Sequence, residues 1–140
     1  FERRRLINTL GRLGKHPIFL TGDIHSEWAN SISATYGEIG CEMVTTSISA
    51  PNVDEILTSA FGTYHKEDNS TSLLVEQAIR DANPWVSHID FDAHGYGVAS
   101  IHRDYVDMLY YRVSDVEDAD ATVSLGEKRQ WRIGEGFVEA

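Results

Sequence analysis

The sequence has one cysteine, few basic residues and no long hydrophobic run. The single cysteine, Cys41, excludes an internal disulfide. No apolar stretch approaches the roughly 18 residues of a membrane-spanning helix, so we expect no transmembrane segment. Only 12 Lys and Arg stand against 22 Asp and Glu, which gives a formal net charge of −10. Nucleic-acid binding relies on Lys and Arg at the phosphates, so we expect no nucleic-acid partner.

The chain has the size of one domain. Its 140 residues, 41% of them hydrophobic, are enough to bury a modest core. Cys41 lies in a strand-like stretch, and a buried, inert thiol is the favoured interpretation. The alternatives are a metal ligand or a partner for a cysteine outside these residues.

The hydrophobic pattern predicts a layered α/β fold. Leu6, Ile7 and Leu10 follow helical spacing, and Pro84 closes a later helix. From His88 onward the pattern changes to that of strands, with a hairpin over 95–113. The predicted elements are a helix over 2–14, a strand over 17–21, a loop and helix start over 22–34 with Ser26 as N-cap, a strand over 39–48, a short helix over 53–60, an exposed loop over 63–71, a helix over 72–83, and a last edge strand over 128–133.

The most informative stretch runs from Ile18 to Ser26. An apolar run ends at Gly22, and Asp23 and His25 follow with the spacing Asp-x-His. If the backbone stays extended there, both side chains lie on one side. A carboxylate and an imidazole at the carboxyl end of a strand are suited to binding a metal. The alternative is that Asp23 caps a turn and His25 lies on the surface.

Three ordered segments resemble one protein family. Leu20–Ser26 with Trp28–Asn30 looks like the last metal-binding motif of the PhoD-like alkaline phosphatases, a branch of the calcineurin-like metallophosphoesterases. Glu42–Pro51 resembles the strand and loop that follow that motif. The stretch from Asn83 to Val98 resembles the family's Asn-Pro, Val-Asp-Leu and Gly-Tyr signature. Together the resemblance covers roughly residues 5 to 113.

The resemblance implies a four-layer α/β/β/α sandwich. Residues 1–140 would form the carboxyl-terminal part of its catalytic domain and supply mainly one of the two sheets. The chain starts at Phe1 without an initiator methionine, and the family's earlier motifs would lie before it. We therefore expect an N-terminal chain of the same enzyme as partner, in a processed heterodimer like those of some PhoD-like phospholipase D enzymes. The family also implies a secreted, periplasmic or extracellular location.

The resemblance also implies a chemistry. His25 would bind the iron (Fe³⁺) position and Asp23 a second metal, calcium in this family, while zinc and manganese are other candidates. Two cations roughly 3.5–4 Å apart neutralise a phosphoryl group and activate a water, so a metal-bound hydroxide would hydrolyse the phosphoester. Ser26, Trp28 and Asn30 are candidates for substrate contact or for orienting a ligand. The activity would be of the alkaline phosphatase type or of the phosphodiesterase and phospholipase D type, with a phosphoester or phospholipid substrate.

The sequence allows two alternative interpretations, one of a second metal site and one of the whole chain. His88, Asp90, Asp92 and His94 alternate along the chain and would form a second metal site if all lay on one strand face. An exposed strand face followed by a turn is the favoured interpretation of that pattern. The whole chain could also be a non-catalytic binding or interaction module that retains the fold.

Overall fold

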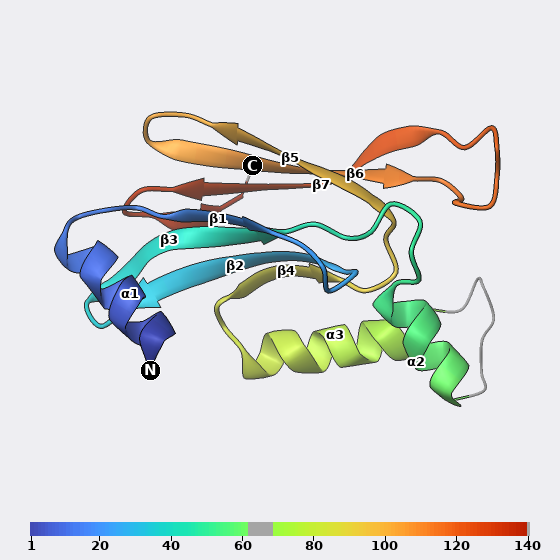
Figure 1. Ribbon diagram of the computed structural model, residues 1–140, viewed down its shortest axis with the longest axis horizontal. Coiled ribbons are helices and arrows are strands. Elements are labelled where there is room, and N and C mark those ends of the chain that lie inside the picture. The colour runs from blue at the N-terminus through green and yellow to red at the C-terminus, as the bar shows by residue number, and fades with distance from the viewer. Residues whose placement is uncertain (62–68, 140) are drawn as a thin grey trace.

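A computed structural model of the chain describes residues 1–61 and 69–139. Most of the loop predicted over 63–71 lies outside these residues. Figure 1 shows two sheets stacked on one another, with helices on one side of the stack. In chain order the elements are α1 (Glu2–Arg12), β1 (Ile18–Thr21), β2 (Glu27–Ala34), β3 (Gly37–Val44), α2 (Val53–Phe61), α3 (Ser70–Ala82), β4 (Val86–Asp90), β5 (Gly95–Ile101), β6 (Tyr105–Val113), β7 (Val123–Arg132) and β8 (Gly136–Val138).

The first sheet is mixed and the second is antiparallel. The first, sheet A, has the strand order β1-β3-β2-β4, and the second, sheet B, has the order β5-β6-β7-β8. In sheet A, β1 runs parallel to β3, whereas β2 is antiparallel to both β3 and β4. The parallel pair matters for function, because the chain leaves β1 and β3 at the same end of the sheet.

The hydrophobic core lies between the two sheets. Alternate residues of β6, namely Val106, Met108 and Tyr110, are almost fully buried, as the two-residue period of a strand requires. They pack against Cys41 and Met43 of sheet A. Tyr110 also donates a hydrogen bond from its hydroxyl to the Trp28 carbonyl oxygen at 2.6 Å, so one buried side chain joins the sheets by packing and by a polar contact.

The helices cover the opposite face of sheet A (Figure 1). Helices α2 and α3 pack on β4, where Val53, Leu57 and Ile79 surround Ile89 and Phe91. Helix α1 lies against β2 and β3, where its Gly11 comes close to Ala34 and Ile39. The described residues therefore form three layers, in the order sheet B, sheet A, helices.

Three predictions about the fold are corrected by the structure. A helix does not begin after Ser26: residues 27–34 form β2, because β3 and β4 hydrogen bond to it from both sides and override local helix signals. The described residues form four strands of each of two sheets, and so do not supply mainly one sheet. Residues 128–132 belong to an inner strand, β7, and β8 forms the edge. No helix within residues 1–61 and 69–139 covers the outer face of sheet B, so the fourth layer is not seen there.

The predicted burial of Cys41 is confirmed. Cys41 is fully buried in the core between the sheets. Burial, with a smaller contribution from the charge of Glu38, raises the pKa of its thiol to about 12. The thiolate is the reactive form of cysteine, so this group is unreactive at neutral pH.

No helix of the described residues is long and apolar enough to cross a membrane.

Gly40 lets β1 approach β3 closely. A Cβ built on Gly40 would lie 2.1 Å from the Pro17 carbonyl oxygen. That same oxygen accepts a hydrogen bond from the Cys41 amide at 3.1 Å. Any side chain at position 40 would therefore push away the start of β1, the strand that leads to the Asp-x-His stretch.

We predict that Gly40→Ala lowers the free energy of unfolding by about 1–3 kcal/mol, because a backbone atom must move to relieve the overlap. Urea denaturation followed by circular dichroism measures the change. Gly22→Ala is the matched control, since its added Cβ would meet Thr45 Oγ1 only at 3.4 Å, an ordinary contact. Equal stability of the two variants would show that β1 does not depend on this close approach.

Candidate metal centre

The stretch between β1 and β2 is a tight loop bent at the two predicted ligands. Asp23 has φ 77° and His25 has φ 52°, and these are the only residues other than glycine with positive φ in the described part of the chain. Gly22, the residue expected to make the turn, has no positive φ. Left-handed backbone at a residue with a side chain costs free energy and is concentrated at functional sites. The loop is thus strained at the two positions that the sequence singled out.

A hydrogen bond fixes the imidazole of His25. Its Nδ1 lies 2.6 Å from the carbonyl oxygen of Pro51. A carbonyl only accepts hydrogen bonds, so Nδ1 carries a proton, and in the neutral imidazole Nε2 then holds the free lone pair. Metal-binding histidines are commonly held in this way, through the ring nitrogen that does not touch the metal. His25 is half-buried and Asp23 is exposed.

The parallel pairing of β1 and β3 explains why Pro51 meets His25. Both strands deliver the chain to the same end of sheet A, and the Thr45 amide donates to the Thr21 carbonyl oxygen at 3.0 Å to continue the ladder. The loop after β1 carries His25, and the loop after β3 carries Pro51. The contact between them is long-range in sequence, and the amino-acid pattern contained no signal for it.

Side-chain hydrogen bonds of Ser26 and Trp28 stabilise the loop. The Ser26 hydroxyl donates to the Ile24 carbonyl oxygen at 3.3 Å and accepts from the Trp28 indole N–H at 2.8 Å. The Trp28 ring also packs against Phe91, with 6.0 Å between ring centroids. Ser26 is therefore a buried loop residue and not a helix N-cap, and Trp28 joins the loop to the core beneath the helices.

Asn30 lies farther along β2, on the helix-covered face of the sheet. Its side-chain amide donates to Glu42 Oε2 at 3.1 Å, while its Oδ1 is buried and has no hydrogen-bond partner. Asn30 and Trp28 line an open hollow of about 370 Å³ together with Gly22 and Ile24. Neither Asp23 nor His25 lines this hollow.

Glu27, the first residue of β2, is a functional candidate that the sequence did not reveal. It is 1% exposed, yet it carries a carboxylate. Arg112 reaches it from β6, with Nη2 2.8 Å from Oε2 and Nε 3.4 Å from Oε1, and His88 Nε2 lies 3.1 Å from Oε2. A buried carboxylate is tolerated only with such partners. His88 and Arg112 lie 61 and 85 residues from Glu27 in the sequence, so no local pattern predicts that they contact it.

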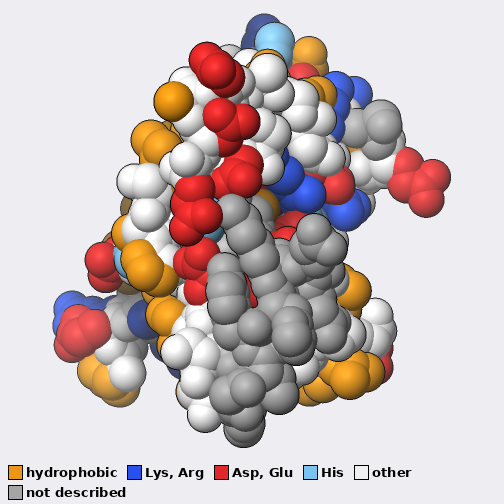
Figure 2. Space-filling view, turned by 90° about the vertical axis from the view of Figure 1, so that its right-hand side faces the viewer, with side chains coloured by type: hydrophobic (Ala, Val, Ile, Leu, Met, Phe, Trp, Pro, Cys, Tyr) orange, Lys and Arg blue, Asp and Glu red, His pale blue; other side chains and the backbone are white. Residues whose placement is uncertain are grey.

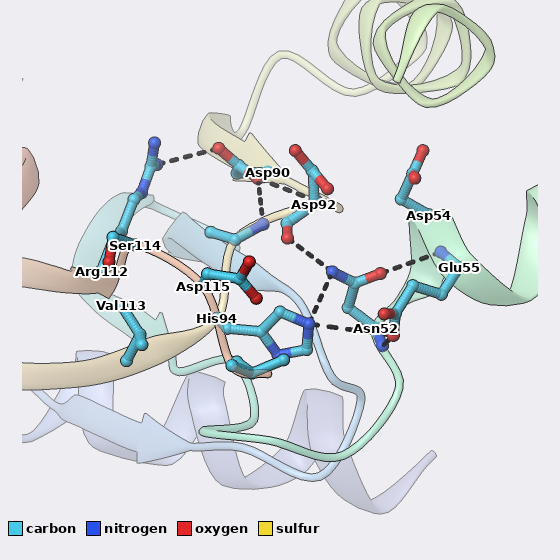
Figure 3. A pocket seen from close by; sticks show the side chains of 12 residues that line it. Asn52, Asp54, Glu55, Asp90, Asp92, His94, Arg112, Val113, Ser114 and Asp115 are labelled. Carbon is cyan, nitrogen blue, oxygen red and sulfur yellow. Dashed lines mark hydrogen bonds and ion pairs between the residues drawn. The ribbon is translucent and has the colours of Figure 1, made fainter. Parts of the chain in front are cut away.

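The alternating His88 to His94 segment does not form one ligand face. Strand β4 ends at Asp90, and within the described residues no three of these side chains are arranged to hold a metal ion. His88 is buried against Glu27, which contradicts an exposed strand face, whereas Asp90 and Asp92 lie at a turn, as expected. Asp90, Asp92 and His94 line a pocket of about 300 Å³ with Asn52 and Arg112 (Figure 3). Burial, and then the charges of Asp54 and Asp90, raise the pKa of Asp92.

Acidic charge dominates this end of the molecule. Figure 2 shows Asp and Glu side chains gathered beside a smaller group of Lys and Arg side chains. Burial lowers the pKa of Arg112, but its hydrogen bond to Glu27 and the charges of Asp90 and Glu27 outweigh burial and raise it above the ordinary value. Arg112 therefore stays charged and offsets the buried carboxylate.

The donors present fit a metal, but they do not complete a centre. The anchored imidazole of His25 and the exposed carboxylate of Asp23 are suitable ligands. Among residues 1–61 and 69–139 no group of three or more His, Cys, Asp or Glu side chains is arranged to hold a metal ion. Two ligands cannot hold two cations, so a two-metal centre would need further ligands from outside the described residues.

Comparison with known proteins agrees with the motifs. A solved structure described as "Structure of PhoD" matches 97% of this chain with a TM-score of 0.72 and 20% identity, which shows a shared fold. The chain spans 24% of the length of that protein's chain. A search of the curated proteins finds no significant match. The family model for the PhoD-like phosphatases matches residues 1–110, which is most of the chain, and so this chain belongs to the PhoD-like phosphatase family.

Proposed function

We propose that this chain supplies the last metal-binding loop of a metal-dependent phosphoesterase. Asp23 and His25 are the proposed ligands. The observation that carries the proposal is the 2.6 Å hydrogen bond from His25 Nδ1 to the Pro51 carbonyl oxygen, which leaves Nε2 available. The positive φ at both residues supports it, because strain of this kind is retained where function requires it.

Each ligand has a chemically matched metal. The imidazole of His25 suits iron or zinc, and we assign iron to it on the family resemblance. Manganese remains a further candidate for the centre. The carboxylate of Asp23 suits calcium, which prefers oxygen ligands. When bound, such cations neutralise the phosphoryl oxygens and lower the pKa of a water molecule. The negative charge of this end of the molecule favours cations over free phosphate esters, so metal binding would precede substrate binding.

Residues of this chain would hold the two proposed ligands in position. His25 holds its ring still through Pro51, and Ser26 with Trp28 keeps the loop braced. Asp23 is exposed, so its carboxylate is accessible to a cation. The remaining ligands would come from an N-terminal chain of the same enzyme, and a secreted or periplasmic location belongs to the same proposal. The substrate is a phosphomonoester or a phosphodiester such as a phospholipid, and the pocket walls that would decide between them lie partly outside this chain.

We predict that Asp23→Ala and His25→Ala, each introduced into the assembled enzyme, lower phosphoester turnover and metal affinity by at least ~100-fold, since each removes a direct ligand. Metal content is measured by inductively coupled plasma mass spectrometry, and turnover with a phosphomonoester and a phospholipid. His16→Ala is the matched control, because His16 also has its Nδ1 3.0 Å from a carbonyl oxygen, that of Ile39, but lies on the surface. Full activity and metal content in both ligand variants would refute the metal proposal and favour a binding module.

A second prediction concerns the strained backbone. Without metal, Asp23→Gly should be more stable than Asp23→Ala by about 1 kcal/mol, because only glycine adopts positive φ without steric cost. Both variants should lose the metal equally. Urea denaturation in the presence of a chelator measures the stability difference. Equal stability of the two variants would mean that residue 23 is not held in the left-handed region in solution.

A further inference from the structure

Arg112 touches the base of the Asp23–His25 loop. Its guanidinium binds the carboxylate of Glu27 through two nitrogens, at 2.8 and 3.4 Å. Glu27 lies two residues after His25 and is 1% exposed. A buried carboxylate is strongly destabilising when a charged partner is removed. The start of β2 is therefore tied to a side chain of the other sheet.

Arg112 also holds the turn after β4. Its Nη2 lies 2.9 Å from Asp90 Oδ2. The other oxygen of Asp90 accepts hydrogen bonds from the amides of Asp92 at 2.9 Å and Ala93 at 2.8 Å (Figure 3). The same guanidinium thus fixes two carboxylates, and through Asp90 it fixes the path of the chain between β4 and β5.

That turn supports the loop on which His25 depends. The Ala93 carbonyl oxygen accepts from Thr46 Oγ1 at 2.7 Å, and the Asp92 carbonyl oxygen accepts from the side-chain amide of Asn52. Residue 52 follows Pro51, whose carbonyl oxygen accepts from His25 Nδ1. Arg112 therefore reaches His25 by two routes: along the chain from Glu27, and across hydrogen bonds from Asp90 to the Pro51 carbonyl.

The geometry points to Arg112 as the positioning residue for His25. This inference rests on the proposed function, and it names a residue from sheet B that no local motif identifies. Nη2 of Arg112 contacts both carboxylates, and Nε adds a second contact to Glu27. Lysine has one nitrogen on a shorter side chain, so it would lose the Nε contact and the reach of Nη2. Loss of Arg112 would leave Asp23 and His25 in place but release both the base of their loop and the carbonyl that holds the imidazole.

The test uses the assembled, metal-loaded enzyme with Arg112→Lys, which keeps the positive charge. We expect metal retention against a competing chelator, measured by mass spectrometry, to fall by roughly 10–100-fold, as for other groups that orient a ligand. Asp90→Asn, which keeps an acceptor for the turn but loses the charge pair, should shift retention in the same direction by less. Arg112→Ala should regain retention when guanidinium ion is added below denaturing concentration.

Arg80→Lys is the matched control. Arg80 is exposed to a similar extent, 34% against 30% for the side chain of Arg112, and it also pairs with a buried carboxylate, that of Glu76, at 3.7 Å. This variant should retain metal as the parent enzyme does. Thermal unfolding, measured alongside, separates a stability loss from a metal-binding loss.

Two results would overturn the inference. One is wild-type metal retention in Arg112→Lys, even if its thermal stability falls, since Arg112 would then only join the sheets. The other is equal loss in Arg112→Lys and Arg80→Lys, which would show a general effect of ion pairs. His25→Ala in the same assay keeps the two proposals distinct: if it leaves metal retention unchanged, the proposed function itself fails.

Discussion

The ion pair between Arg112 and Glu27 is the contact on which the rest of the structure depends. It joins the first residue of β2 in sheet A to β6 in sheet B, inside a protein that carries ten more negative than positive charges. A buried carboxylate in such a chain is costly unless a cation accompanies it. Arg112 also contacts Asp90, so one side chain of sheet B holds the ends of two neighbouring strands of sheet A, whose spacing is set by their backbone hydrogen bonds. The apolar core between the sheets supplies most of the packing.

The loop that carries Asp23 and His25 combines strain with rigid support. Two left-handed residues raise its free energy, and the Pro51 carbonyl, the Ser26 hydroxyl and the Trp28 indole hold it in that state. An unsupported loop of this kind would relax to an ordinary turn. In the proposed function, this arrangement prepares the ligands before a metal arrives, so that little conformational freedom is lost on binding.

Local patterns were enough to predict much of this chain. Helical spacing at Leu6, Ile7 and Leu10 led to α1, the alternation along 105–113 led to β6, and the ordered motifs led to the family. The failure after Ser26 has a clear cause: β2 is stabilised by strands on both sides, and Glu27 looks like a first-turn helix residue until its partners at 88 and 112 are known. The role of Pro51 was hidden for the same reason, because a backbone carbonyl carries no sequence signal.

The long connections have a consequence for folding. Residues 27 and 112 are 85 positions apart, and residues 27 and 88 are 61 apart. Closing loops of that length is entropically unfavourable and makes contacts of high contact order form slowly. The β5–β6 hairpin is local and can pair early, whereas the strained loop is supported only once sheet B has docked on sheet A. Metal capture by Asp23 and His25 is therefore coupled to the last stage of folding, and a chain whose sheets have not yet docked would have the ligands in its sequence but no preformed site.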